Sequence, residues 1–411
     1  MLAECVSAMN VKSKQAGFLR RLRWSIPWLR RYPLWAIDAW FRRIGERNRP
    51  QHLIFVVANH FEPSWNEDHK PTDWVTQQLR LEHWCKQARA IGRAVQDCDG
   101  VPFRHTYFFP AEQYHPSLLD RLAEEQAHGF GEVEIHLHHG VQQPDDASNL
   151  RRTLEDFRDI LAQKHRCLSR LDGVGRPMYA FVHGNFALAN SLAGLYCGVD
   201  SEMQILAETG CYADFTLPAV PHQSQVPRIN AIYQCGRPLH ERSPHRSGPN
   251  LHIGDFPTLP ILFSGPLVFD WHRAWYRLLL PRIEDGLLAS NRPPTLDRLK
   301  NWCRAGVGIR GKPEWVFIKF YCHGFFPFDQ PAMIGERMRC FLEDMLELAD
   351  RNGKLKVHFV TAREAFNIAM AAVDGQTGGP GLYRNYRLRQ IMQAAPEFGP
   401  QREKPLKHLN D

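Results

Sequence analysis

The sequence predicts an α/β fold built around a parallel sheet, and three observations carry this prediction. Apolar segments that fit strands alternate with amphipathic segments that fit helices, from about residue 51 to residue 373. The strand-like segments are apolar almost throughout, as in "HLIFVV" (52–57), which is typical of parallel strands buried on both faces. Several of these strands end in polar residues, and parallel folds place their ligands at the carboxyl ends of strands.

The alternation can be followed along the chain. Its first half predicts strands at 52–63, 104–112, 132–139, 177–185 and 211–218, with helices at 73–95, 116–129, 149–171 and 202–210. Residues 218–266 are rich in Pro, Gly, Ser and His, and we interpret them as an insertion over one mouth of a barrel, with 228–234 as a hairpin strand. The pattern then resumes with a helix at 296–306, a strand at 314–324, a helix at 335–353, and a strand and helix within 356–373. In the last helix, Thr361 and Glu364 fit a capping box.

A basic helical extension precedes the main domain. Residues 17–49 contain two short helix patterns split by Pro27 and Pro33. The apolar residues of the second helix share one face: Leu34, Ile37, Phe41 and Ile44. This face fits either a helix lying on an anionic membrane surface or a helix that caps the main domain, and we expect the cap because most amphipathic helices pack on a core. The domains are therefore expected at 1–50, at 51–375, and at 376–411, a basic tail that we expect to be loosely attached.

Charge and cysteine usage exclude some classes of protein. Residues 1–50 hold eleven Lys/Arg and three Asp/Glu, whereas the rest of the chain holds 40 basic and 41 acidic residues, so a uniformly basic nucleic-acid-binding protein is disfavoured. The ten cysteines form no C-x-x-C pair, which indicates a reduced, cytosolic protein. No apolar run is long enough for a membrane span, and the first 30 residues lack the apolar core of a signal peptide. We expect a cytoplasmic location, with 17–49 as the route to any peripheral contact with the inner membrane face.

Histidines recur at the ends of the predicted strands. Six of them lie within a few residues of a strand end: His60, His105, His136, His138, His183 and His323. Ordinary loop starts explain Asn or Asp at such positions easily, but they explain repeated histidine poorly. Because parallel strands end at one edge of a sheet, these side chains are expected to share one site.

Strand alternation sorts these side chains by face. In "EVEIHLHHG" (132–140), His136 and His138 share a face, and two imidazoles at a strand end suit a divalent metal, although a solvated polar strand end remains the alternative. In "ANHFEP", His60 and Glu62 share a face while Asn59 points the other way. The late strand places Lys319 and His323 on one face. A lysine within an apolar strand requires a partner, and a salt bridge to a carboxylate such as Glu134 is the plain structural explanation.

The order of these motifs resembles the polysaccharide deacetylase (NodB homology) superfamily. The resemblance covers roughly residues 50–375: a polar or acidic first strand end, "TYFF", "HGFGEVEIHLHH", "VHGN", and a late "CHG" followed by "FVTAREAF". It implies a distorted (β/α) barrel of about seven strands, of the glycoside hydrolase/deacetylase type. It also implies metal-dependent removal of N- or O-acetyl groups from a sugar or polysaccharide intermediate.

The resemblance also implies roles for residues. His60, His136 and His138 would hold a divalent metal, with zinc expected, and Glu62 would take a proton from water. His323 would protonate the leaving group, and Asn185 would help to hold the oxyanion. Other residues are expected to line the substrate site: Asn59, His105, His183, Asp214 and Lys319.

This chain departs from the family pattern at two places. The first family motif has adjacent Asp residues, one of which is the base, whereas this chain has Asn59, which cannot act as a base. The second motif spaces its histidines differently from 136–139. Two alternatives therefore stay open. One is a catalytically inactive carbohydrate-binding or assembly protein of a polysaccharide-synthesis pathway. The other is a glycoside hydrolase on a similar barrel, with Glu62 and Asp214 as its carboxylates.

Overall fold

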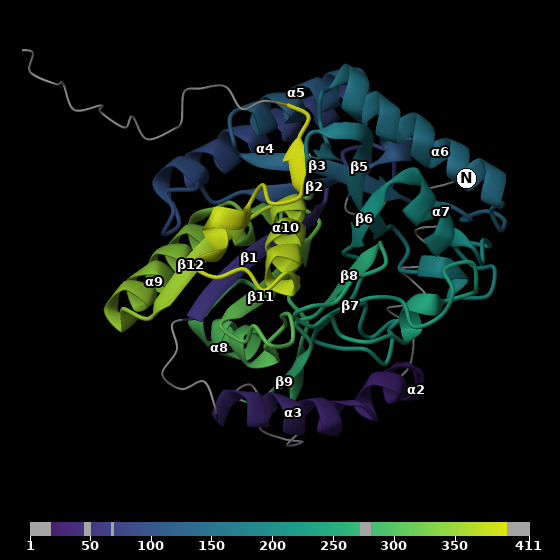
Figure 1. The fold of residues 1–411 in the computed structure, drawn as a ribbon. Coiled ribbons are helices and arrows are strands. Elements are labelled where there is room, and N and C mark those ends of the chain that lie inside the picture. The colour runs from purple at the N-terminus through teal and green to yellow at the C-terminus, as the bar shows by residue number, and fades with distance from the viewer. Residues whose placement is uncertain (1–17, 45–50, 67–69, 272–280, 393–411) are drawn as a thin grey trace, which may run out of the picture.

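The central feature of the fold is a curled, mostly parallel sheet (Figure 1). A computed structural model describes residues 18–44, 51–66, 70–271 and 281–392. The strands pair in the order β11 (Trp315–Cys322), β1 (Gln51–His60), β2 (His105–Pro110), β3 (Gly131–Leu137), β5 (Val174–His183), β6 (Cys211–Asp214), β8 (Ile261–Ser264) and β7 (Ala231–Tyr233). β12 (Leu355–Val360) also pairs with β1, and only β7 runs antiparallel to its neighbour along this path. The predicted α/β class and parallel sheet are confirmed.

Helices cover the outer face of the sheet. Apolar side chains of these helices pack with the outward residues of the strands into one large core. The helices are α4 (Trp74–Ala94), α5 (Pro116–Ala127), α6 (Ala147–Asp159), α7 (Glu202–Thr209), α8 (Leu296–Ala305) and α9 (Glu336–Asn352). The inner face encloses a second core, together with α10 (Ala362–Val373), every residue of which is buried. The two cores explain why the strands are apolar on both faces.

Backbone pairing does not close the sheet into a barrel. In the part of the chain that the structure describes, no hydrogen-bonded ladder joins β8 to β11. Side chains connect them instead, because Lys319 on β11 donates to the Phe263 carbonyl of β8 at 3.2 Å. The rings of Phe263 and Phe317 also meet edge to face, with centroids 5.9 Å apart.

Local sequence signals place several element ends correctly. The capping box at α10 is present, with Thr361 accepting from the backbone of Glu364 and Glu364 accepting from the backbone of Thr361. Asp73 caps α4 by accepting from Thr76. α7 ends at Gly210, whose φ of 106° is readily accessible to glycine. The predicted helices therefore begin and end close to the expected residues, with one exception.

That exception is the segment 149–171, for which the prediction of a single long helix was wrong. α6 ends at Asp159, a π-helical turn follows at Ile160–Lys164, and the chain then forms β4 (Ser169–Leu171), which pairs antiparallel with β5. Local periodicity cannot foresee this, since tertiary pairing with β5 decides the conformation of Ser169–Leu171. The predicted insertion likewise contains β8, a strand of the main sheet, beside the expected hairpin strand β7.

The C-terminal segment is attached more firmly than expected. β13 (Leu388–Gln390) pairs with β4. Arg384 binds Asp97 at 2.7 Å, and its carbonyl accepts from Arg363 at 3.0 Å. The expectation of a loose tail is therefore wrong up to residue 392, because buried charges hold the segment to the domain. The rest of that predicted tail lies outside the described residues.

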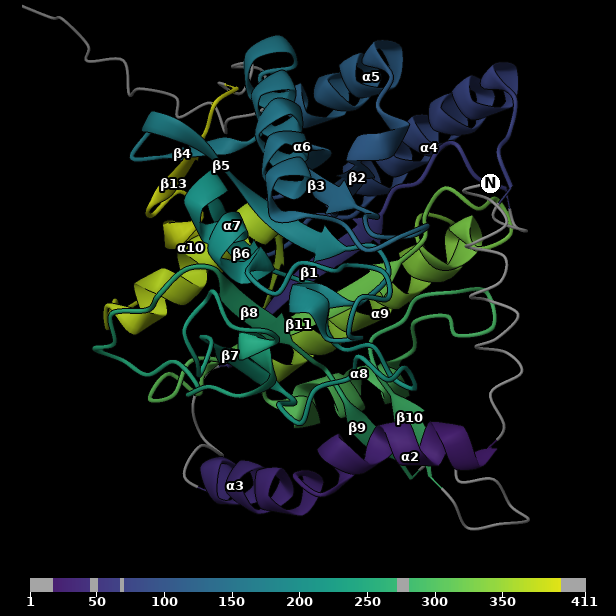
Figure 2. The ribbon, with the colours of Figure 1, turned by 90° about the vertical axis from the view of Figure 1, so that its right-hand side faces the viewer.

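The N-terminal helices α2 (Phe18–Leu29) and α3 (Tyr32–Ile44) lie end to end along one edge of the molecule (Figures 1 and 2). They pack near a hairpin of β9 (Val268–Asp270) and β10 (Arg282–Glu284), where the Trp28 ring lies 5.6 Å from that of Phe269. Arg42 donates to the Gly306 carbonyl at 3.1 Å. The helices do cap the domain, but Leu34 and Phe41 are 61% and 64% exposed. The predicted apolar face points outward, which corrects the expectation that it packs on the core.

Candidate metal centre

Five predicted side chains gather where β1, β3 and β11 end. His60 is the last residue of β1, Glu62 follows it, His136 and His138 lie at the end of β3, and His323 follows β11. The ring of His60 lies 5.0 Å from that of His136 and 4.9 Å from that of His323. The structure therefore brings these five side chains together at one edge of the sheet.

Glu62 stands between two groups of possible metal ligands. Ligand atoms of His60, Glu62 and His323 lie within 4.8 Å of one another, and so do those of Glu62, His136 and His138. The Oε1 atom of Glu62 is 3.1 Å from Nε2 of His136 and 3.6 Å from Nε2 of His138. Glu62, to which the resemblance gives the role of base, thus occupies the central position of the cluster.

The other ring nitrogens of His136 and His138 face hydrogen-bond acceptors. Nδ1 of His136 donates to the Val182 carbonyl at 2.9 Å, and Nδ1 of His138 donates to Glu112 at 2.5 Å. An acceptor at Nδ1 leaves Nε2 as a lone pair in the neutral ring. In that tautomer two Nε2 lone pairs point toward one carboxylate oxygen, an arrangement that a bound cation would stabilise; without a cation, the 3.1 Å contact to Glu62 requires a proton on Nε2 of His136. Backbone carbonyls and carboxylates orient metal-binding histidines in this way.

The electrostatics of the cluster keep Glu62 anionic, and although burial opposes it, the charge of Glu112 raises the pKa of His138. Burial raises the pKa of Glu62, but the hydrogen bond from His136 and the neighbouring rings of His323 and His138 hold this pKa well below its usual value. Burial, with help from the neighbouring imidazoles, lowers the pKa of His60 and of His323. A carboxylate that resists protonation is a good ligand and a weak base.

Two other predicted residues lie on the opposite face of the sheet. Asn59 accepts from the backbone N–H of Gly324 at 2.8 Å and lies 3.4 Å from Nδ1 of His105. His105 stands at the start of β2 rather than at its end, with its ring 5.3 Å from that of Trp84. The alternation that separated Asn59 from His60 is confirmed. The structure does not bring Asn59 or His105 to the cluster, because strand geometry points them toward α4.

Asp214 and Lys319 form a separate buried group. Nζ of Lys319 donates to three carbonyl oxygens: those of Phe215, Leu217 and Phe263. Asp214 accepts from Thr216 at 2.7 Å. Burial raises the pKa of Asp214 to about 7 and lowers that of Lys319 to about 7. The suggested partner Glu134 is wrong, since it accepts from Tyr212 and from the Ala180 backbone instead.

His183 is the last residue of β5 and Asn185 follows it, at the same edge of the sheet. The N–H of Asn185 points to Nδ1 of His183 at 3.3 Å, and the His183 ring lies 4.9 Å from that of His139. His183 thus belongs with His139, the third histidine of the "HLHH" run, and with Glu202. Alternation separates His139 from His138, so the run serves two clusters rather than one.

Glu112 was missed by the reading of the sequence. It lies in the short helical turn Ala111–Gln113 that follows β2, and its carboxylate holds Nδ1 of His138. The only available signal was its place after a strand that ends beside β3.

A scan against protein-family models and a search of curated proteins found no match to this chain.

Proposed function

We propose that this protein is a metal-dependent hydrolase of the polysaccharide deacetylase kind, acting on an N- or O-acetylated sugar. One observation carries the proposal: a buried carboxylate oxygen of Glu62 lies 3.1 Å from Nε2 of His136 and 3.6 Å from Nε2 of His138. Three ligands with a remaining open position are the usual catalytic set for zinc. Zinc is the expected ion because it is a borderline cation that binds imidazole nitrogen and carboxylate oxygen together.

The arrangement of the strands supports the proposal. Parallel strands β11, β1, β2, β3, β5, β6 and β8 follow one another around the sheet, and Lys319 spans the gap between the first and the last. We take this arrangement as an incompletely closed (β/α)7-type barrel. The cluster then lies at the carboxyl ends of the strands, where barrels of this type carry out their chemistry.

Four residues of the cluster, together with the neighbouring Glu112, have a role in this proposal. When bound, a divalent cation supplies Lewis acidity, which polarises an acyl carbonyl and makes water more acidic. Glu62, His136 and His138 hold the ion, while Glu112 keeps the proton on Nδ1 of His138. His323, neutral because burial lowers its pKa, takes a proton from water and returns it to the leaving amine or alkoxide.

Aromatic side chains next to the cluster support a sugar substrate. The Phe326 ring stacks 6.1 Å from that of His323, and Phe328, half exposed, stacks 6.0 Å from Phe326. The Trp65 ring lies 5.0 Å from that of His138. The apolar face of a sugar ring packs well on such surfaces.

The test is metal-dependent release of acetate. The full-length protein is stripped with a chelator, reloaded with Zn²⁺, and assayed on a panel of N- and O-acetylated oligosaccharides. We expect activity to vanish on stripping and to return with Zn²⁺. His136→Ala should abolish it, whereas His128→Ala, which removes an exposed histidine hydrogen-bonded only to the Glu124 carbonyl, should not.

Two results would count against the proposal. A protein that binds Zn²⁺ here but releases no acetate favours the carbohydrate-binding alternative. A protein that cleaves glycosidic bonds without metal favours the glycoside hydrolase. Against that last alternative, Asp214 accepts from Thr216 and interacts with Lys319 in a buried group apart from the cluster of Glu62.

A further inference from the structure

A second buried cluster lies behind the first. It consists of His139, His183, Cys197 and Glu202, whose ligand atoms all lie within 4.8 Å of one another. These residues come from the ends of β3 and β5, from the loop between β5 and α7, and from the first residue of α7. All four are buried.

The spacing of this cluster suits a tetrahedral metal. Tetrahedral zinc, with bonds of about 2.0–2.3 Å, separates its ligand atoms by roughly 3.3–3.8 Å. Sγ of Cys197 lies 3.4 Å from Oε2 of Glu202, and Nε2 of His183 lies 3.8 Å from Oε1 of Glu202. Nε2 of His139 lies 3.1 Å from the same oxygen. Small side-chain shifts would therefore place all four atoms around one ion.

The surroundings of the cluster resemble the outer shell of a metal site. Asp145 accepts from Nδ1 of His139 at 3.0 Å, which directs Nε2 toward the cluster. The backbone N–H of Val199 points to Sγ of Cys197 at 3.5 Å, and the N–H of Ala189 donates to Glu202 at 2.6 Å. Backbone donors of this kind stabilise a thiolate and a carboxylate ligand.

A metal-free hydrogen-bond network leaves one group unexplained. In such a network the His139 imidazolium would lie between Asp145 and Glu202. His183, however, is fully buried, and its Nε2 atom, aimed into the cluster, has no hydrogen-bond partner. An unsatisfied buried nitrogen is destabilising unless something binds it. The missing partner and the neighbouring thiol together point to a soft cation, which Nε2 binds when the ring proton is on Nδ1 in place of the 3.3 Å contact from the Asn185 N–H.

We infer that His139, His183, Cys197 and Glu202 bind a structural Zn²⁺ ion, distinct from the proposed catalytic metal. The ion would hold the irregular loop 184–200 onto the ends of β3 and β5. In that loop Phe186, Ala189 and Asn190 adopt positive φ values near 50–60°, which non-glycine residues seldom do without support. A closed set of four protein ligands is typical of structural zinc.

Cobalt substitution separates this site from the first one. Of these two clusters only the second contains a cysteine, so Co²⁺ bound there gives a sulfur-to-cobalt charge-transfer band in the near ultraviolet. We expect this band in the full-length protein and in His136→Ala, with one equivalent of metal remaining in that variant. Cys197→Ser should lose the band, whereas Cys167→Ser, at another fully buried free cysteine, should keep it.

The unmodified protein can also be tested, so the outcome does not depend on whether a variant folds. X-ray absorption at the zinc edge of the protein as purified should show a sulfur neighbour at about 2.3 Å. A Co²⁺-loaded protein without the thiolate band, or bound zinc without a sulfur neighbour, would overturn the inference. Neither measurement depends on catalytic activity.

The outward face of α2 and α3 carries a second, independent inference. The exposed apolar residues of these helices are Leu22, Ile26, Leu34, Ile37, Trp40 and Phe41. Exposed arginines such as Arg20, Arg23 and Arg30 lie among them, and Asp38 is the only acidic residue of the two helices. No described helix combines the length and apolarity needed to cross a bilayer. Such a mixture of apolar and basic side chains is typical of helices that lie in a membrane interface.

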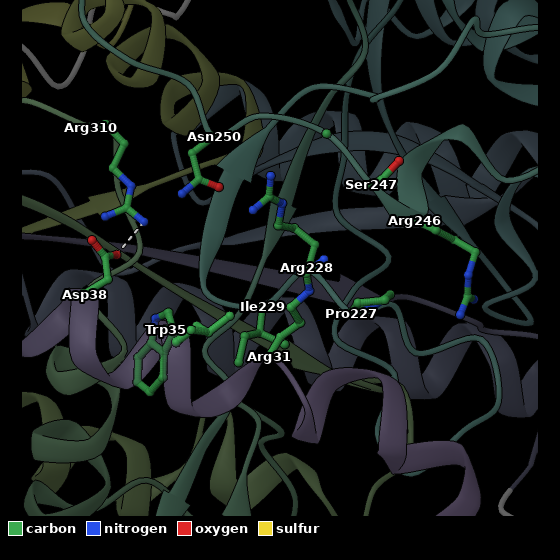
Figure 3. A pocket seen from close by; sticks show the side chains of 12 residues that line it. Arg31, Trp35, Asp38, Pro227, Arg228, Ile229, Arg246, Ser247, Asn250 and Arg310 are labelled. Atoms are coloured by element: carbon green, nitrogen blue, oxygen red, sulfur yellow. Dashed lines mark ion pairs between the residues drawn. The ribbon is translucent and has the colours of Figure 1, made fainter.

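A basic pocket adjoins this face. Its cavity of about 550 Å³ lies against α3 and is lined by Arg31, Arg228, Arg246 and Arg310 (Figure 3). Arg310 is paired with Asp38 at 2.7 Å, which leaves three arginine charges that no acidic lining residue balances. Guanidinium groups bind phosphate well. We propose that α2 and α3 dock on an anionic bilayer, with a lipid phosphate in this pocket.

Vesicle binding tests the docking. The protein should sediment with phosphatidylglycerol vesicles and not with phosphatidylcholine vesicles, and salt should weaken binding. Ile37→Gln with Phe41→Gln should reduce binding at least about tenfold. Leu382→Gln, at a residue 78% exposed elsewhere, should not. Equal binding to both vesicles, or binding of inorganic phosphate without vesicle binding, would overturn the proposal.

Discussion

Glu112 offers a sharp test of the proposed catalytic metal site, because it acts on the metal only through His138. Its carboxylate accepts from Nδ1 of His138 at 2.5 Å, and Nε2 of the same ring faces Glu62. Glu112→Gln keeps the shape of the side chain and an oxygen that can accept the same hydrogen bond. It removes the charge that makes the imidazole a more basic ligand.

The size of the effect follows from exposure. Loss of a carboxylate behind a metal-binding histidine costs about 10–100-fold in metal affinity. The Glu112 side chain is 22% exposed and that of His138 is 5% exposed, so water replaces part of the lost interaction. We therefore expect Zn²⁺ to bind about tenfold more weakly, or about 1.4 kcal/mol.

The assay is a competition titration against a chromophoric chelator, repeated with Co²⁺. Cobalt at the site of His138 lacks the sulfur band expected at Cys197, so the two sites are read separately. Glu124→Gln is the matched control, since Glu124 is exposed on α5 and pairs with Arg121. If Glu112→Gln binds metal at the His138 site as tightly as the parent protein, the proposed ligand set is wrong.

Three predictions concern stability. Burial raises the pKa of Glu134 to about 8, so its neutral form stabilises the fold below about pH 4.5 and this contribution is lost as the pH rises toward 8. Glu134→Gln should remove a slope of roughly 1 kcal/mol per pH unit, measured by urea unfolding from pH 5 to 8; an unchanged slope would contradict this. Lys319→Met removes the donor of three buried carbonyls and should destabilise the protein by roughly 3 kcal/mol in the same assay, a loss under 1 kcal/mol being the contrary result. Arg363→Met leaves the buried carboxylate of Glu132 without its cation and should lower the free energy of unfolding by about 3–5 kcal/mol. Adding Glu132→Gln should restore part of this stability, and additive losses would refute the pairing.

The sequence by itself determined the α/β class, most of the helices, and the grouping of five side chains at one edge of the sheet. These features depend on local periods: an apolar strand must be buried, and alternation fixes which face His60 and Asn59 occupy. The common direction of parallel strands then brings their polar ends together. No contact needs to be known for this reasoning.

Only the tertiary structure decided which groups touch. Glu112, Cys197 and Glu202 carry no periodic signal, and they meet their histidines because separate segments fold back to the same strand ends. Tertiary pairing also recruited β8 and β4 into sheets. The same holds for α3, where packing of Trp35 and Ala39 on the domain left the more regular apolar face outside. The periodic pattern of a helix identifies a face that could be buried, whereas the surface it packs against determines which face is buried.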